Sequence, residues 1–126
     1  MAYGRTFYLV FDAWRLKLMG KPSKGFFDEV YRIVSKIPEG SVMTYGMIAI
    51  MLGNPYASRI VGYAMHSAPP ELNLPCHRVV NKEGRMAPMD IFGGEENQRQ
   101  MLEKEGITFK ENGCIDMEKH LLNWTE

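Results

Sequence analysis

Hydrophobic residues recur at helical spacing along the first third of the chain. The first set marks one face of a helix over residues 6–19, ended by Gly20: Phe7, Val10, Phe11, Trp14 and Leu18. The second set predicts a helix that begins near Ser23 and stops at the Pro-Glu-Gly sequence of residues 38–40: Phe26, Val30, Ile33, Val34 and Ile37. We interpret both helices as core-forming elements.

Two shorter helices follow, and their signals are local. Thr44 is a good N-cap for a helix over residues 45–52, which a Gly-Asn-Pro turn ends. A second helix opens at Ala57 or Ser58 and stops by Ala68, because two prolines follow. Two short helices joined by a tight turn that contains glycine predict a helix-turn-helix.

Small residues in the second of these helices, Gly62 and Ala64, have two interpretations. They keep the helix slim, which suits close approach to a flat or grooved ligand. They also allow two helices to pack tightly against each other, and both interpretations can hold at once.

The C-terminal half mixes short strands and one more helix. Residues 78–80 and 85–86 flank an Asn-Lys-Glu-Gly turn and predict a strand-turn-strand wing. An irregular loop spans residues 87–94, and a helix over residues 95–105 precedes a glycine that stops it. A hairpin turn is expected at residues 111–113. We expect the tail to pack on the body through three residues: Leu121, Leu122 and Trp124.

Composition narrows the class of protein. The 126 residues suit a single domain, mostly helical with a small β wing, and no apolar run is long enough to span a bilayer. The N-terminus lacks the apolar segment of a secretory signal. Two cysteines are too few for a disulfide framework, which fits a reducing compartment, so we expect a cytoplasmic protein without membrane contact.

The formal charge of zero hides an uneven distribution. Residues 1–24 carry five bases against one acid, residues 25–94 carry six of each, and residues 95–126 carry four bases against eight acids. A neutral total argues against a protein that coats nucleic acid by electrostatics, but it permits a local basic face with a few phosphate contacts.

The strongest candidate for chemistry is the sequence Cys76-His77-Arg78. Neighbouring cationic groups favour a thiolate near neutral pH, and the thiolate is the nucleophile. The alternative is an inert buried cysteine, which is the expectation for Cys114. A Cys-His hydrolase is a further alternative, but adjacent residues on a strand point to opposite faces, which disfavours direct proton transfer.

Two segments together resemble a known family. Residues 75–79, Pro-Cys-His-Arg-Val, match the active-site pentapeptide of the O6-alkylguanine-DNA alkyltransferases and their alkyltransferase-like relatives. Residues 57–65 are similar to the family's recognition helix. The resemblance covers residues 25–109 as the DNA-binding and active-site domain, with a helical extension at residues 1–24 and a C-terminal tail, residues 110–126, packed on the domain.

The resemblance implies a winged helix-turn-helix protein that binds duplex DNA through the minor groove, extrudes O6-alkylguanine and transfers the alkyl group irreversibly to its own cysteine. In that scheme Cys76 is the acceptor, His77 is the base acting through a water, and Glu105 orients the imidazole. It implies no metal and no organic cofactor.

The resemblance also implies a set of DNA-binding residues. Arg59 looks like the finger that fills the gap left by the extruded base, and Tyr45 corresponds to the tyrosine that helps rotate the target phosphate. The remaining residues expected to bind DNA are Ser58, Gly62 and Arg78.

Three departures from the family pattern stand out. Ala68 replaces the asparagine that is usual in the turn before the active site. The loop of residues 87–94 is two residues longer than the family's Gly-Tyr-x-Gly-Gly loop and lacks its tyrosine. A short helical extension stands in place of the separate N-terminal domain.

Three functions are consistent with the sequence. The first is a DNA repair protein that accepts the alkyl group on Cys76. The second is a non-catalytic lesion sensor, because the alkyltransferase-like relatives usually carry tryptophan or alanine at that position, bind alkylated DNA and hand it to nucleotide excision repair proteins. The third is a winged-helix transcription regulator, which rests on the fold alone.

Overall fold

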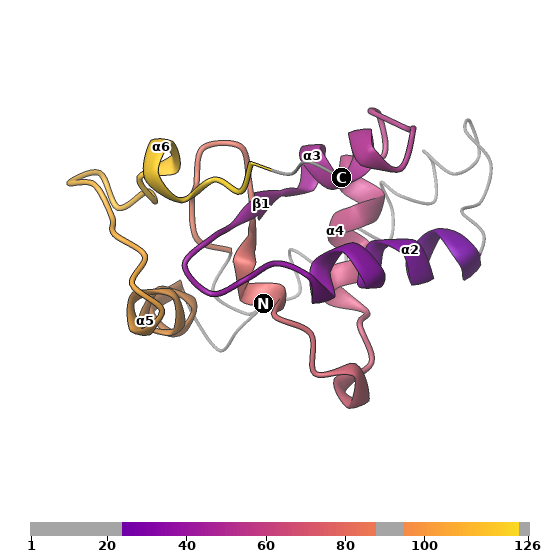
Figure 1. Cartoon of the computed structure of the whole chain (residues 1–126), viewed down its shortest axis with the longest axis horizontal. Helices are drawn as coiled ribbons and strands as arrows, with labels where there is room; N and C mark the ends of the chain where they lie inside the picture. Colours follow the sequence, from indigo (N-terminus) through magenta and orange to yellow (C-terminus); the bar gives the residue numbers. More distant parts are fainter. Residues whose placement is uncertain (1–23, 88–94, 124–126) are drawn as a thin grey trace.

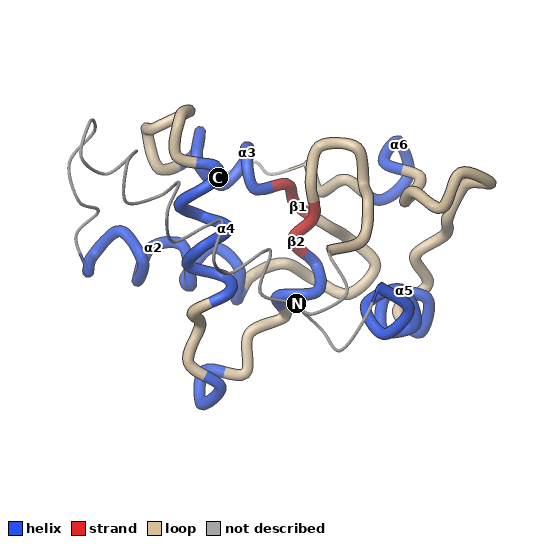
Figure 2. Tube along the Cα trace, turned by 180° about the vertical axis from the view of Figure 1, so that it is seen from behind, coloured by secondary structure: helices blue, strands red, loops and turns tan. Residues whose placement is uncertain are grey.

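The computed structural model describes residues 24–87 and 95–123. The helix expected at residues 6–19, most of the 87–94 loop and Trp124 lie outside these ranges. Figure 1 shows helices α2, α3 and α4 grouped at one end of the molecule and α5 and α6 at the other. A two-stranded sheet lies between the two groups, as the tube of Figure 2 makes plain.

The first group forms around the helix α2, Lys24–Ser35. Its apolar face, predicted from the sequence, is buried at Val30, Ile33 and Val34, and it packs on α4. Ile37, just past the end of the helix, completes the buried face.

The predicted helix-turn-helix is confirmed. Helix α3, Tyr45–Met51, begins where the Oγ1 of Thr44 accepts a hydrogen bond of 3.0 Å from the Met47 amide. Helix α4, Ser58–His66, follows a turn in which Gly53 has a φ of +81°. The two helices make the densest contact between elements in the described residues.

The sheet pairs β1, Met43–Thr44, with β2, Val79–Val80, in parallel register. Because side chains alternate across a strand, Met43 and Val79 face the core of the first helix group. Val80 faces a second core with Val42, together with Leu102, Ile107 and Ile115. The sheet therefore separates two small cores.

The predicted wing is wrong in its pairing. Residues 85–86 form no strand, and β2 pairs with β1 instead. The turn itself is present, since the Gly84 amide donates to Asn81 O at 2.9 Å. After it the chain docks on the C-terminal hairpin, where Ile115 N–H donates to Gly84 O at 3.0 Å. At Gly84, with φ of +80°, a Cβ would lie 3.1 Å from the Ile115 amide nitrogen, so only glycine fits.

The helix α5, Glu95–Lys104, ends as predicted at Gly106, which has a φ of +90°. The Gly106 amide donates to Glu103 O at 3.0 Å and the Ile107 amide to Leu102 O at 3.1 Å. This is a Schellman motif, and it makes Glu105 the C-cap residue with a fixed orientation.

The predicted C-terminal hairpin is also confirmed, with Phe109 and Ile115 paired antiparallel. A short helix that the sequence did not predict, α6, Met117–His120, leads from the hairpin back to the sheet. There Leu121 pairs with Val42, and Leu122 packs on the first core. None of the helices in the described ranges has the length and apolar character needed to cross a membrane.

Candidate functional site

Cys76 opens a single turn of 3-10 helix, η2, Cys76–Arg78, rather than the expected strand. It follows another 3-10 turn, η1, Pro70–Leu72. Pro75, with φ of −78° and ψ of 62°, forms an inverse γ-turn in which the Cys76 amide donates to Leu74 O at 2.8 Å. A 3-10 helix rotates successive side chains by about 120°, so Cys76 and His77 leave the turn in different directions.

His77 points toward α5. Its Nε2 lies 2.8 Å from the Glu105 Oε2, and both side chains are only 11–12% exposed. A carboxylate can only accept, so the Nε2 carries the proton and the Nδ1 of the neutral ring is an acceptor. The predicted joining of His77 to Glu105 is therefore present across 28 residues of sequence.

Arg78 occupies the other side of the same carboxylate. Its Nε donates to Glu105 Oε1 at 2.8 Å and its Nη2 to Oε2 at 2.7 Å, a bidentate pair. Its Nη1 donates to Ile37 O at 2.7 Å. With its side chain 13% exposed, Arg78 lies inside the protein, which does not fit the DNA contact expected from the sequence.

The pKa values of the Glu105 carboxyl and the Cys76 thiol are shifted in opposite directions. Burial alone would raise the pKa of Glu105, but the hydrogen bonds from Arg78 and His77 and their charges hold it below its usual value. Burial raises the pKa of the Cys76 thiol, against a smaller opposing effect of its own backbone amide. Burial therefore acts against the resting thiolate expected from the sequence, and Glu105 binds the two basic side chains that were expected to favour it.

Two residues near the site had not been expected there. Gln98 on α5 is fully buried, and its Nε2 donates to His77 O at 3.1 Å while its Oε1 accepts from the Ala87 amide at 2.7 Å. Helical spacing offered a signal, since Gln98 lies four residues before Leu102 and seven before Glu105. Tyr31 on α2 donates to Ala64 O at 3.0 Å, and its pKa is raised first by burial and then by the negative charge that Cys76 carries when it is ionised.

Apart from Arg78, the residues expected to bind DNA lie on the helix-turn-helix. Tyr45 is the first residue of α3, and Ser58 and Arg59 open α4; all three are half-buried. Gly62 is buried, as is Ala64, which belongs to the first core. For Ala64 the packing interpretation therefore holds, and the buried position of Gly62 does not fit a direct DNA contact.

Other candidates resolve simply. Ala68, which replaces the family's asparagine, is half-buried just beyond α4. Cys114 is a buried residue, as expected. Across residues 24–87 and 95–123, no three His, Cys, Asp or Glu side chains are grouped so as to hold a metal ion.

The fold and this cluster define a helix-turn-helix protein with a half-buried thiol next in sequence to a His-Glu-Arg network. The family model for the DNA-binding domain of 6-O-methylguanine DNA methyltransferase matches residues 25–107. The chain belongs to this family.

Three relatives illustrate the similarity. The chain is 45% identical over 82 residues to the alkyltransferase-like protein 1 of Schizosaccharomyces pombe, covering 65% of this chain and 76% of that protein. It is 39% identical over 100 residues to a DNA base-flipping protein of Escherichia coli, covering 79% and 75%. A methylated-DNA–protein-cysteine methyltransferase of Shigella flexneri is 41% identical over 81 residues, with 64% and 46% covered.

A solved structure agrees with the sequence relatives. The S. pombe protein Atl1, crystallised with damaged DNA that contains O6-carboxymethylguanine, superposes with a TM-score of 0.69 at 35% identity. The match covers 84% of this chain and 100% of that one.

Proposed function

We propose that this chain binds duplex DNA carrying O6-alkylguanine, extrudes the base and transfers its alkyl group to the Sγ of Cys76. The observation that carries the proposal is the half-buried thiol one residue before an imidazole whose second nitrogen is bound by Glu105. That arrangement leaves the Nδ1 of His77 able to take a proton.

The transfer balances without a cofactor. Cys76 loses its proton to the Nδ1 of His77 through a water, and Glu105 stabilises the imidazolium that forms. The sulfur then attacks the alkyl carbon, an S–C bond forms, and the bond from that carbon to the guanine O6 breaks with its electron pair going to the base. Guanine takes up one proton, so the proton lost by the thiol is matched. The thioether is not hydrolysed, and each molecule reacts once.

Arg78 serves this step as a positioning residue in the proposal. Its bidentate pair fixes both carboxylate oxygens of Glu105, and its bond to Ile37 O anchors the pair to the first helix group. Carboxylates held in this way orient an imidazole and stabilise its charged form.

The test is intact-mass measurement after incubation with an excess of O6-methylguanine duplex. We expect one added methyl group in the wild type and in Cys114→Ala, and none in Cys76→Ser. A wild-type protein that binds the duplex and keeps its mass contradicts the transfer.

A second function is favoured by a specific observation. Burial raises the pKa of the Cys76 thiol, which favours its protonated form, and two of the relatives named above are an alkyltransferase-like protein and a base-flipping protein. A lesion sensor would bind the same duplex, leave the mass unchanged, and pass the damaged DNA to nucleotide excision repair proteins.

Both functions need the lesion to be sensed through base extrusion, and Arg59 tests that shared step. Extrusion leaves a gap in the stack that a long side chain can fill. We expect Arg59→Ala to weaken binding to lesion duplex by about tenfold, measured by fluorescence anisotropy, because a specific arginine contact contributes about 1–3 kcal/mol. Binding to undamaged duplex should change less, and equal losses on both would indicate a plain phosphate contact.

A further inference from the structure

Charge is nearly absent from the helix-turn-helix. Across residues 43–68, Arg59 is the only Asp, Glu, Lys or Arg. Each phosphate that a protein neutralises needs a cationic side chain, so this unit has little capacity for binding through phosphates. Its affinity for a duplex has to come largely from contacts of another kind.

The same unit carries the most exposed apolar side chains in the described part of the chain. Tyr56 is 72% exposed and Ile50 is 64% exposed, whereas the other large exposed hydrophobic residues are only 40–48% exposed: Leu72, Met101 and Leu121. Ile50 lies near the end of α3 and Tyr56 in the turn before α4, so the two flank the turn of the motif. We call this pair the turn patch.

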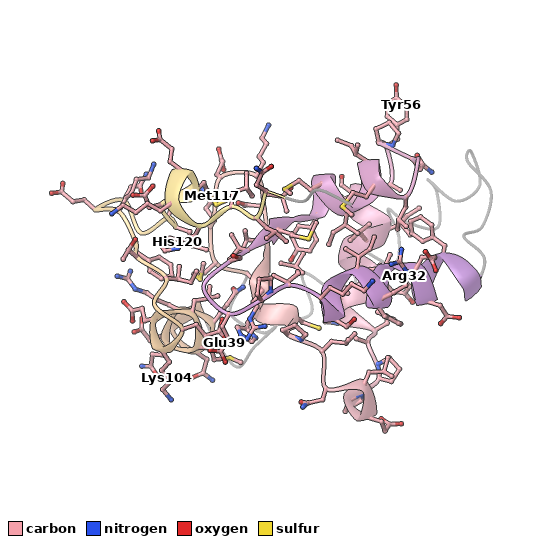
Figure 3. All side chains as sticks on the ribbon, in the orientation of Figure 1. Arg32, Glu39, Tyr56, Lys104, Met117 and His120 are labelled. Atoms are coloured by element: carbon pink, nitrogen blue, oxygen red, sulfur yellow. The ribbon has the colours of Figure 1, made fainter. Side chains whose placement is uncertain are left out.

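Tyr56 stands on a backbone that hydrogen bonds hold in place. The Asn54 Oδ1 accepts from the Tyr56 amide at 3.2 Å, and the Asn54 backbone bridges two buried alanines, donating to Ala49 O at 3.0 Å and accepting from the Ala57 amide at 3.0 Å. Figure 3 shows the labelled Tyr56 side chain pointing away from the body of the protein. A tyrosine on a fixed backbone offers a large contact surface with little entropy to lose.

We propose that the turn patch packs its apolar surface against the deoxyribose rings of the duplex backbone beside the extruded base. The proposal rests on the proposed function, because it assumes that α4 faces the DNA. Tyr56 lies three residues before Arg59 in sequence, in the turn that leads into α4. Sugars present apolar edges at every nucleotide, so this contact adds affinity independent of both base sequence and salt.

The experiment measures duplex affinity between low and moderate salt for wild type, Tyr56→Ala, Tyr56→Lys and Met101→Ala, by fluorescence anisotropy. We expect Tyr56→Ala to bind lesion and undamaged duplexes about tenfold more weakly, because a large apolar contact is lost. The slope of log affinity against log salt should stay that of wild type. Met101→Ala, which changes an exposed apolar residue on α5 at the other end of the molecule, should bind as wild type does.

Tyr56→Lys tests the position. A lysine that faces the sugar-phosphate wall should steepen the salt slope by about 0.9, the increment for one added phosphate contact. Basic residues elsewhere in the chain contribute equally to every variant, so differences between slopes are unaffected by them.

The outcomes are distinct from failure of the proposed function. If the wild type does not bind lesion duplex, the proposed function fails. If the wild type binds lesion duplex and Tyr56→Ala keeps full affinity, the turn-patch proposal is overturned. A loss of salt dependence together with affinity in Tyr56→Ala also overturns it. Binding of a protein partner by the patch would not rescue the proposal. Urea unfolding should give Tyr56→Ala the stability of wild type, since an exposed side chain adds little to the core.

Discussion

The helix-turn-helix holds one permanently charged side chain in residues 43–68, whereas the neighbouring turn at Cys76 concentrates an arginine, an imidazole and a carboxylate within hydrogen-bonding distance. The first region exposes apolar side chains, and the second buries charged ones. Buried ion pairs respond strongly to the loss of a partner and to pH. Exposed apolar contacts respond to neither. The two regions can therefore be perturbed separately.

The largest effect is expected for Glu105→Gln. The amide keeps the shape of the carboxylate but cannot accept three hydrogen bonds or balance Arg78, so the buried guanidinium loses its counter-charge. We expect a loss of about 3 kcal/mol in the free energy of unfolding, measured with urea. Affinity for undamaged duplex should stay close to wild type, because the helix-turn-helix is not altered.

Glu39 offers a matched control for this variant. Its carboxylate lies 3.9 Å from the same Arg78 Nη2 but is 76% exposed, and Figure 3 shows the labelled residue near the centre of the molecule. Solvent screens such a pair, so Glu39→Gln should cost less than about 1 kcal/mol. Equal losses of unfolding free energy in the two variants would mean that burial does not set the strength of the ion pairs at Arg78. A large loss of duplex affinity in Glu105→Gln would mean that the Cys76 turn and the helix-turn-helix are energetically coupled.

Acid should reduce the effect of Glu105→Gln. The pKa of Glu105 is lower in the folded chain than its unfolded value of 4.5, so the stabilisation is complete above that value and is lost as the pH falls through the folded pKa. The difference in stability between wild type and Glu105→Gln should therefore be constant between pH 7 and 6 and shrink below about pH 4.5, as the unfolded carboxyl protonates. A difference that grows on acidification would contradict the assigned pKa direction.

How far the sequence predicts this structure depends on the range of each signal. Thr44, the Gly-Asn-Pro turn and the two prolines after Ala68 act on their own neighbours, and the helices that they bound are where they were predicted. The partner of Val79–Val80 is set by packing across the chain, and a two-residue strand carries too little pattern to reveal it.

The site divides in the same way. The family resemblance implied that His77 and Glu105 meet, but it could not tell that Arg78 points inward or that burial raises the pKa of the Cys76 thiol. On a 3-10 turn the side chains of consecutive residues point in different directions, so Cys76 does not share the direction of the two basic side chains that follow it. Both of those side chains hydrogen-bond to Glu105 instead. Side-chain direction and solvent exposure are tertiary properties.

The next effect in size is expected for Gln98. Its buried amide joins the Cys76 turn to Ala87, so Gln98→Met leaves the part-buried His77 O and Ala87 N–H without these partners. We expect a loss of about 2 kcal/mol by urea unfolding, the cost of unpaired buried polar groups. Gln98→Glu can still accept from Ala87 but cannot donate to His77 O when ionised, and a buried carboxylate is itself unfavourable.

The readout that separates positioning from simple stability is the rate of methyl transfer under conditions where every variant is folded. A positioning role for Gln98 predicts slower transfer in Gln98→Met at unchanged duplex affinity. A variant that is destabilised but transfers at the wild-type rate would leave Gln98 with a packing role alone.

The smallest effect concerns the resting thiol and needs no DNA. Because burial raises the pKa of Cys76, its thiolate fraction near neutral pH is below that of a free cysteine. We expect iodoacetamide to modify Cys76 slowly at pH 7, with a rate that keeps rising past the pH at which a free cysteine levels off, measured by mass spectrometry with Cys76→Ser as the background from Cys114. A rate that levels off below that pH would show cationic groups acting on the sulfur. In that case the positive charges of Arg78 and His77 would act on Cys76 as well as on Glu105, and the description of the Cys76 turn as a closed ion-pair network would be wrong.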